Sequence, residues 1–240
     1  MAYLRSTLYL IFLIVTVIPY AIAGILWAPL PLHVRYKLTT GWSRLALWGA
    51  RVICGIRWQV KGVENLPDGP AIILSKHQSA WETLYLVSKM PRDVCFVYKR
   101  ELHWVPFFGW GLASLNMIPI DRSKGRDAFE QVLRQGRARL QEGRWPLLFP
   151  EGTRIAPGKM GRFKMGGALL ASRAGAVVIP IAHNAGECWP RNAFIKRPGL
   201  VTLSIGPTIS PEGLTPEELN QKVQAWIEGE MRRLNPEKYE

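Results

Sequence analysis

Residues 71–82 read AIILSKHQSAWE, and this stretch decides the fold class of the chain. Ala71 to Ser75 form an apolar run of strand length, and a helix is expected to begin near Ala80, directly after the polar residues. A short apolar strand followed by a helix is typical of α/β layer proteins. Such folds tend to hold ligands where a strand ends and a helix begins, so the polar residues HQS lie where a site is expected.

The same alternation continues from residue 56 to the end of the chain. Four further strands are predicted, at residues 93–98 (DVCFVY), 145–149 (WPLLF), 176–181 (AVVIPI) and 200–206 (LVTLSIG). One internal helix is predicted from apolar residues at helical spacing: Phe129, Val132, Leu133 and Leu140. The last helix is predicted from an N-cap, a first-turn proline and a capping-box glutamate: Thr215, Pro216 and Glu218. Residues 56–240 are therefore expected to form a single α/β domain.

The composition of the whole chain limits the classes of partner that it could bind. The three cysteines of the chain lie far apart at no metal-ligand spacing, which favours a reducing, cytoplasmic setting for the folded part. The formal net charge of +13 would suit nucleic acid, an anionic membrane or acidic substrates. Seven basic residues and no acidic one precede Glu64, and they flank an apolar run. This distribution favours an anionic membrane surface over nucleic acid.

The apolar run extends from Leu8 to Leu32 without a charged residue, which is long enough to cross a bilayer. A cleaved signal peptide is an alternative, but the run continues past the small residues near position 23. Pro19 near the centre of the run and Pro29 and Pro31 at its end would bend or stop a helix, so a re-entrant hairpin stays open. The basic residues after the run place the downstream side in the cytoplasm. Residues 1–55 are thus expected to form transmembrane or re-entrant and interfacial helices, with the protein anchored to the inner membrane.

His77 and Glu82 are the candidate catalytic pair of the HQSAWE segment. Side chains five residues apart do not share a helix face, so they can meet only if His77 lies in the loop and Glu82 in the first helical turn. The carboxylate would then fix the imidazole tautomer and leave the other ring nitrogen as a general base. The alternative is a capping histidine beside a solvated glutamate.

Two further segments carry candidate binding groups, and only the first is suited to phosphate by its own residues. The first is FPEGTR (residues 149–154), where Gly152 allows close backbone approach, Thr153 offers a hydroxyl and Arg154 can grip a phosphate with two N–H groups. The second, residues 99–122, has basic residues at both ends and crowded aromatic residues that belong either to the core or to a lipid contact.

Together these motifs resemble the glycerolipid acyltransferase family, which includes the bacterial lysophosphatidate acyltransferases. Four blocks carry the likeness, over roughly residues 58–206: HQSAWE (77–82), the block from KREL to IDR (99–122), FPEGTR (149–154) and VIPIAHN (178–184). The resemblance implies a mixed sheet flanked by helices. It also implies transfer of an acyl group from acyl-CoA or acyl carrier protein to the 2-hydroxyl of lysophosphatidate, with no metal or other cofactor.

The resemblance assigns a role to each motif. His77 would be the general base and Glu82 its orienting partner, although the family usually has aspartate at this position. The substrate phosphate would be held by Lys99, Arg122, Gly152, Thr153 and Arg154, and Glu151 would order its loop. Two alternatives stay open: an acyltransferase that uses glycerol 3-phosphate or another lysolipid, and a non-catalytic basic protein that binds membranes.

Overall fold

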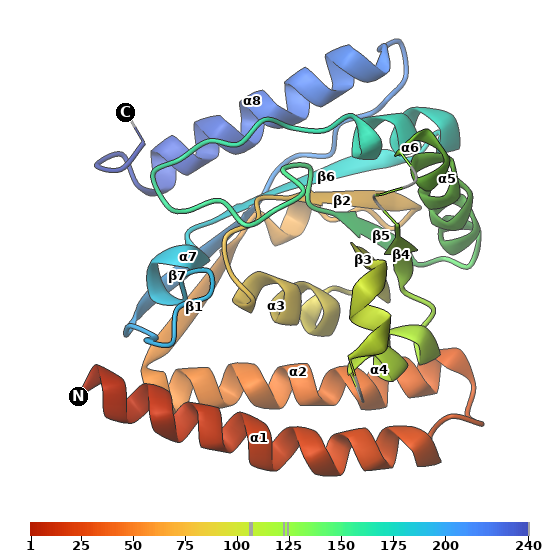
Figure 1. Ribbon diagram of the computed structural model, residues 1–240. Coiled ribbons are helices and arrows are strands. Elements are labelled where there is room, and N and C mark those ends of the chain that lie inside the picture. Colours follow the sequence, from red (N-terminus) through yellow and green to blue (C-terminus); the bar gives the residue numbers. More distant parts are fainter. Residues whose placement is uncertain (106–107, 122, 124, 240) are drawn as a thin grey trace.

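The computed structural model describes residues 1–105, 108–121, 123 and 125–239. Arg122, one of the expected phosphate-binding cations, lies outside these residues. The described chain forms three layers, in which helices cover both faces of one sheet (Figure 1).

The described residues contain a seven-stranded sheet with the order β1-β7-β6-β2-β5-β3-β4. The strands are β1 (Ile56–Lys61), β2 (Ala71–Ser75), β3 (Val94–Lys99), β4 (Ile118–Ile120), β5 (Trp145–Leu148), β6 (Val177–His183) and β7 (Gly199–Ile205). Only the β6–β7 pair is antiparallel among them, so the sheet is mixed, as the resemblance implied. The strands predicted from sequence match β2, β3, β5, β6 and β7 to within two residues at each end.

β2 lies at the centre of the sheet and contributes to both hydrophobic cores. Ile72 and Leu74 join the core on one face, and Ala71 and Ile73 join the core on the other. A strand covered on both faces reads as a continuous apolar run, which explains the AIILS segment.

Two edge strands, β1 and β4, were not predicted. β1 alternates buried and accessible positions and carries Arg57 and Lys61, so its apolar signal is weak. β4 is three residues long and contains Pro119, which sequence patterns count against a strand. A proline is tolerated there because β4 has a partner on one side only.

The two faces of the sheet are covered by different groups of helices (Figure 1). One face carries α5 (Gly125–Gln141), α6 (Gly166–Ala174) and α8 (Pro216–Leu234). The other carries α3 (Trp81–Lys89) with α2 (Leu32–Cys54) and α1 (Ala2–Leu26) beneath it. The shorter helical segments are η1 (Val63–Asn65), η2 (Arg100–Trp104), α4 (Phe108–Ser114) and α7 (Ala185–Cys188). The predicted capping box at the start of α8 is present.

α1 and α2 form an antiparallel helical hairpin. The Tyr9 hydroxyl donates to Ala46 O at 2.9 Å, and Trp42 Nε1 donates to Thr16 Oγ1 at 3.2 Å. The expectation that Pro19 would bend or stop the first helix was wrong in one respect, because α1 continues through Pro19 to Leu26. The chain reverses only in the segment that contains the later prolines.

The hairpin also packs against the α/β domain. The buried Tyr36 hydroxyl donates to Val87 O at 2.8 Å and accepts from Val94 N at 2.8 Å, which fastens α2 to the end of α3 and the start of β3. Near the other end, Lys196 N donates to Ser6 Oγ at 2.9 Å. α1 is nevertheless largely exposed. Only 6% of its most apolar 18-residue stretch is buried, and the helix has the length and apolarity of a membrane segment.

Candidate active site

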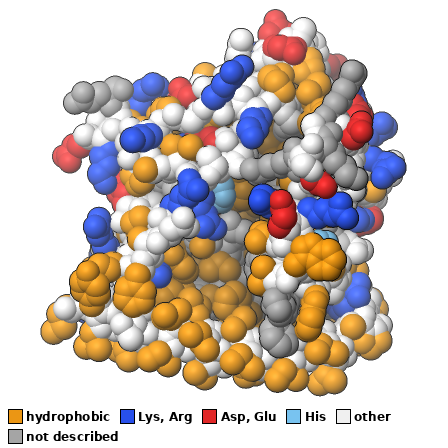
Figure 2. Space-filling model, in the orientation of Figure 1, with side chains coloured by type: hydrophobic (Ala, Val, Ile, Leu, Met, Phe, Trp, Pro, Cys, Tyr) orange, Lys and Arg blue, Asp and Glu red, His pale blue; other side chains and the backbone are white. Residues whose placement is uncertain are grey.

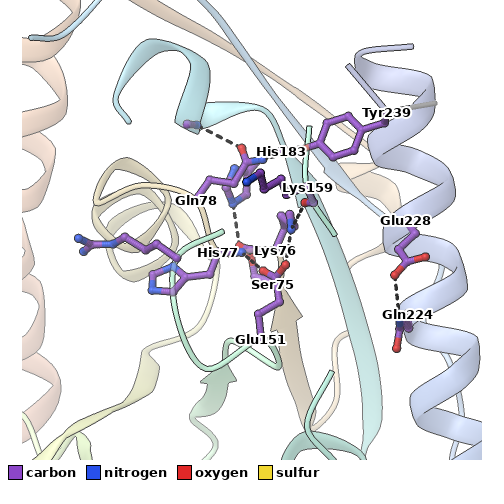
Figure 3. A network of polar contacts seen from close by, with 12 residues as sticks. Ser75, Lys76, His77, Gln78, Glu151, Lys159, His183, Gln224, Glu228 and Tyr239 are labelled. Carbon is purple, nitrogen blue, oxygen red and sulfur yellow. Dashed lines mark hydrogen bonds and ion pairs between the residues drawn. The ribbon is translucent and has the colours of Figure 1, made fainter. Parts of the chain in front are cut away.

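Three loops meet at the carboxyl ends of neighbouring parallel strands. β2 leads into residues 76–80, β5 leads into FPEGTR, and β6 ends at His183. β2 pairs with β5 on one side and with β6 on the other, both in parallel, so all three loops emerge at the same edge of the sheet. Segments about 75 and 105 residues apart in sequence thus surround one point (Figure 3).

His77 and Glu82 are in direct contact. His77 Nδ1 lies 2.8 Å from Glu82 Oε1, and the same oxygen accepts from the backbone N–H groups of Gln78 and Ser79 at 2.9 Å each. The Glu82 side chain is fully buried, whereas that of His77 is 15% exposed. Because a carboxylate only accepts hydrogen bonds, His77 Nδ1 carries the proton and Nε2 is left with its lone pair. This is the arrangement that a general base requires.

Glu82 is poised to remain ionised. Burial by itself raises its pKa, but the neighbouring His183, the hydrogen bond from His77 and the Ser79 N–H more than offset this, so the pKa lies below its ordinary value. The second oxygen, Oε2, is buried without a hydrogen-bond partner and lies 4.0 Å from His183 Nε2. Aspartate is the residue that the family resemblance implied at this position. Glutamate is longer by one methylene, and its Oε1 nevertheless lies at hydrogen-bond distance from His77 Nδ1.

His183 forms hydrogen bonds with the backbone next to His77 and with the start of α7. Its Nε2 donates to the carbonyl oxygen of Lys76 at 2.8 Å, and its Nδ1 accepts from Ala185 N at 3.3 Å. Burial lowers the pKa of His183, and both ring nitrogens are satisfied in the neutral form. His183 thus fixes the peptide that precedes His77 rather than acting as a second base.

The FPEGTR segment holds His77 from the other side. The Phe149 ring stacks on the His77 imidazole, with ring centroids 3.8 Å apart and an interplanar angle of 16°. Glu151 Oε2 accepts from His77 N at 2.9 Å, and Glu151 Oε1 forms a buried ion pair with Lys76 (Figure 3). Ile155 N donates to His77 O at 2.8 Å. Glu151 therefore joins the FPEGTR loop to the histidine loop.

A cavity of about 1060 Å³ opens beside His77. Part of its wall is apolar and comes from both the hairpin and the domain, including Leu13 and Val17 of α1, Leu84 of α3 and Val132 of α5. In the view of Figure 2, hydrophobic side chains cover the lower side of the molecule, and basic side chains surround a hollow. The site is therefore amphipathic.

The cavity is also lined by cations. Lys99 and Arg154, both expected from sequence, contribute to the lining, and so does Lys164, which was not expected. Arg154 Nε is buried without a hydrogen-bond partner, whereas Lys99 Nζ lies 3.1 Å from Glu101 Oε1 on the surface. Gly152 also lines the cavity, but Thr153 is exposed and lies outside it.

Gly152 has a conformation that few other residues adopt. Its φ of +68° lies in the left-handed region, and a Cβ built on it would lie 2.8 Å from Lys164 Nζ. The glycine therefore permits both the turn after β5 and the position of the lysine over that turn. Because this contact exists only in the folded chain, no signal for Lys164 was present in the sequence alone.

Within the described chain, no group of three His, Cys, Asp or Glu side chains is placed to hold a metal ion. The fold and the site together define an α/β enzyme with a histidine–carboxylate pair beside an amphipathic cavity, joined to an apolar helical hairpin.

The chain belongs to the acyltransferase family, whose model matches residues 57–184. It is 45% identical over 238 residues to a protein of Pseudomonas aeruginosa named 1-acyl-sn-glycerol-3-phosphate acyltransferase, covering 97% of this chain and 92% of that protein. It is 31% identical over 179 residues to the mouse 1-acyl-sn-glycerol-3-phosphate acyltransferase alpha, covering 73% of this chain and 63% of that protein.

A solved structure shares the fold. The crystal structure of the 1-acyl-sn-glycerophosphate acyltransferase of Thermotoga maritima superposes with a TM-score of 0.80 at 23% sequence identity, covering 97% of this chain and 95% of that chain. The likeness includes nearly the whole of both chains, so it extends beyond the residues matched by the family model.

Proposed function

We propose that this enzyme transfers a fatty acyl group from a thioester to the 2-hydroxyl of lysophosphatidate, giving phosphatidate. The observation that carries the proposal is the contact of 2.8 Å between His77 Nδ1 and the buried Glu82 carboxylate, beside a cavity that has both an apolar wall and cations. The substrate named by the relatives has the matching parts: a hydroxyl to be deprotonated, an acyl chain and a phosphate.

The reaction follows from the hydrogen bonds of His77. Nε2 takes the proton of the acceptor hydroxyl as the oxygen attacks the thioester carbonyl carbon. The imidazolium that forms is stabilised by Glu82, whose Oε1 is already fixed by two backbone N–H groups. When the C–S bond breaks, the imidazolium returns its proton to the leaving thiolate, and His77 is ready for another cycle.

The phosphate of the acceptor is proposed to bind Arg154, together with Lys99 and Lys164. A guanidinium can make two parallel hydrogen bonds to phosphate oxygens, and the unpartnered Nε of Arg154 is consistent with this role. Thr153 is exposed outside the cavity, so we propose that it contributes to the turn rather than to phosphate binding.

We further propose that the hairpin sits in the cytoplasmic leaflet of the membrane instead of crossing it. α2 lies between α1 and α3, so α1 could not enter the bilayer alone without breaking the contacts that join the hairpin to the domain. The outer residues of α1, such as Ile11, Val15 and Ile18, are half exposed or more and would contact lipid. Trp104, which is 82% exposed, would make a second contact at the membrane surface.

The test is product identification with membranes that contain the protein. Labelled acyl-CoA or acyl carrier protein thioester would be supplied with lysophosphatidate, glycerol 3-phosphate or another lysolipid in separate reactions, and the products separated by thin-layer chromatography. The proposal is supported if lysophosphatidate is the acceptor that is acylated, giving labelled phosphatidate, while the other acceptors are not. Preference for another acceptor would overturn the substrate assignment.

The His77→Ala variant separates catalysis from mere membrane binding. Loss of a general base lowers turnover by roughly 10²-fold to 10⁴-fold. The variant should still sediment with membranes, because the exposed apolar residues of α1 are unchanged. Unchanged turnover in a folded His77→Ala protein would leave a binding role as the better explanation.

A further inference from the structure

The residues between α8 and Tyr239 return to the active site. After α8 ends at Leu234, the Asn235 side-chain amide donates to Glu187 of α7, and Lys238 Nζ lies 3.6 Å from the same carboxylate oxygen. A Cβ built on Gly158, in the loop after FPEGTR, would lie 3.1 Å from the carbonyl oxygen of Lys238. Residues 235–239, the C-terminal tail, are thus packed between α7 and the loop that follows FPEGTR.

The Tyr239 hydroxyl reaches the loop that carries His77. Tyr239 is 5% exposed, and its hydroxyl oxygen accepts a hydrogen bond of 2.8 Å from Gln78 Nε2 (Figure 3). The other end of the same amide, Gln78 Oε1, accepts from Gly186 N at 3.2 Å. Gln78 is 1% exposed, so its side chain is held at both ends in an environment without bulk water.

The position of Gln78 affects both members of the pair His77 and Glu82. Its backbone N–H donates to Glu82 Oε1, and its peptide follows directly after His77. A change in the position of Gln78 therefore moves both the carboxylate that orients the imidazole and the backbone that carries it. Misplacement of a catalytic group by about 1 Å can cost on the order of 10²-fold in rate.

We propose that Tyr239 is a positioning residue, and that the C-terminal tail completes the active site by holding Gln78 through the tyrosine hydroxyl. The consequence for turnover rests on the function proposed above, whereas the consequence for the order of the loop does not. Tyr239 does not line the cavity, so it acts through Gln78 and not on the substrate.

The Tyr239→Phe variant removes only the hydroxyl. Loss of the buried hydrogen bond to Gln78, together with the contact of the hydroxyl with the Gly158 backbone, should lower kcat about threefold to tenfold. The Michaelis constants for the acyl donor and for lysophosphatidate should change by less than about twofold, because no substrate contact is lost.

The matched control is Tyr9→Phe, which removes another buried tyrosine hydroxyl whose hydrogen bond, 2.9 Å to Ala46 O, lies within the helical hairpin. Both variants should lose comparable thermal stability, but only Tyr239→Phe should lose turnover. Equal loss of turnover in the two variants would mean that stability, not positioning, is responsible, and would overturn the proposal.

A double substitution tests the route through Gln78. In a Gln78→Leu background, the Tyr239→Phe change should add less than about a twofold further loss, because the hydrogen bond is already absent. If the two losses multiply in full, Tyr239 does not act through Gln78.

Hydrogen exchange measures the loop without reference to activity. The N–H groups of His77, Gln78 and Ser79 all donate to the carboxylates of Glu151 or Glu82, and they should exchange faster in Tyr239→Phe than in wild type. Unchanged exchange together with unchanged kcat would refute the proposal. If the wild-type enzyme made no phosphatidate, the proposed function would fail, yet the exchange measurement would still decide whether the tail orders this loop.

Discussion

Replacement of Glu82 by glutamine isolates the contribution of its charge to catalysis. In the native enzyme Oε1 accepts three hydrogen bonds, from His77 Nδ1 and from the N–H groups of Gln78 and Ser79. The amide oxygen of glutamine can occupy the position of Oε1 and accept the same three. The orientation of His77 is therefore expected to persist while the negative charge beside its ring is lost.

The magnitude follows from the charge that develops on His77. Opposite unit charges about 4 Å apart interact by up to ~4 kcal/mol at an effective dielectric constant of about 20, and a hydrogen bond to a charged group exceeds a neutral one by ~1 to 2 kcal/mol. A loss of ~2 to 4 kcal/mol corresponds to a fall in kcat of roughly 30-fold to 10³-fold. The Michaelis constants should change little, because Glu82 is fully buried and absent from the cavity lining.

The assay is phosphatidate formation from labelled acyl thioester and saturating lysophosphatidate, with the unfolding temperature recorded for each variant. Glu82→Asp is the matched variant, because it keeps the charge but withdraws it by one methylene. Its loss should stay within about tenfold, the value of one weakened hydrogen bond. A folded Glu82→Gln enzyme that turns over within twofold of wild type would refute the orienting and stabilising role.

The other predictions concern the phosphate, the membrane and pH. Arg154→Ala should raise the Michaelis constant for lysophosphatidate about tenfold to 100-fold, because one charge-assisted contact contributes ~1.5 to 3 kcal/mol. Arg154→Lys should recover part of this loss, since a lysine lacks the two-pronged guanidinium. If only the Michaelis constant for the acyl donor changes, the phosphate site lies elsewhere. The intact protein should sediment with membranes and stay there in high salt, because α1 offers an apolar face; release into the supernatant by salt alone would contradict the proposed insertion. Since burial lowers the pKa of His183, the unfolded chain binds the additional proton, and stability should fall as pH drops below about 6.5, the ordinary pKa of histidine. Thermal unfolding between pH 7.5 and 5.5 should show a shallower dependence in His183→Gln than in wild type, and parallel curves would exclude this contribution.

Some of the molecule was determined by local sequence alone. The AIILS run was predicted as a strand because it is short and continuously apolar, and the α8 capping box depends on residues three positions apart. The His77–Glu82 contact also lies within this range, because five residues of loop and first helical turn are enough to bring the two side chains together. Patterns within one segment are sufficient when the contacts that they specify lie within that segment.

The edge strands and the course of α1 were decided by the tertiary structure. Pro119 is tolerated in β4 because that strand has a neighbour on one side only, and this position depends on the order of all the strands. α1 continues through Pro19 while it packs along α2, whose own position depends on Tyr36 contacts with α3 and β3.

The surroundings of His77 depend on the fold in the same way. Phe149 stacks on its ring, Glu151 binds its backbone, and His183 holds the preceding peptide only because β5 and β6 lie on either side of β2. Tyr239 reaches Gln78 across 161 positions of sequence. The sequence by itself thus determined which residues meet within one strand–loop–helix unit, and the strand order determined the rest, because contacts between distant segments form only when the sheet places their ends at a common edge.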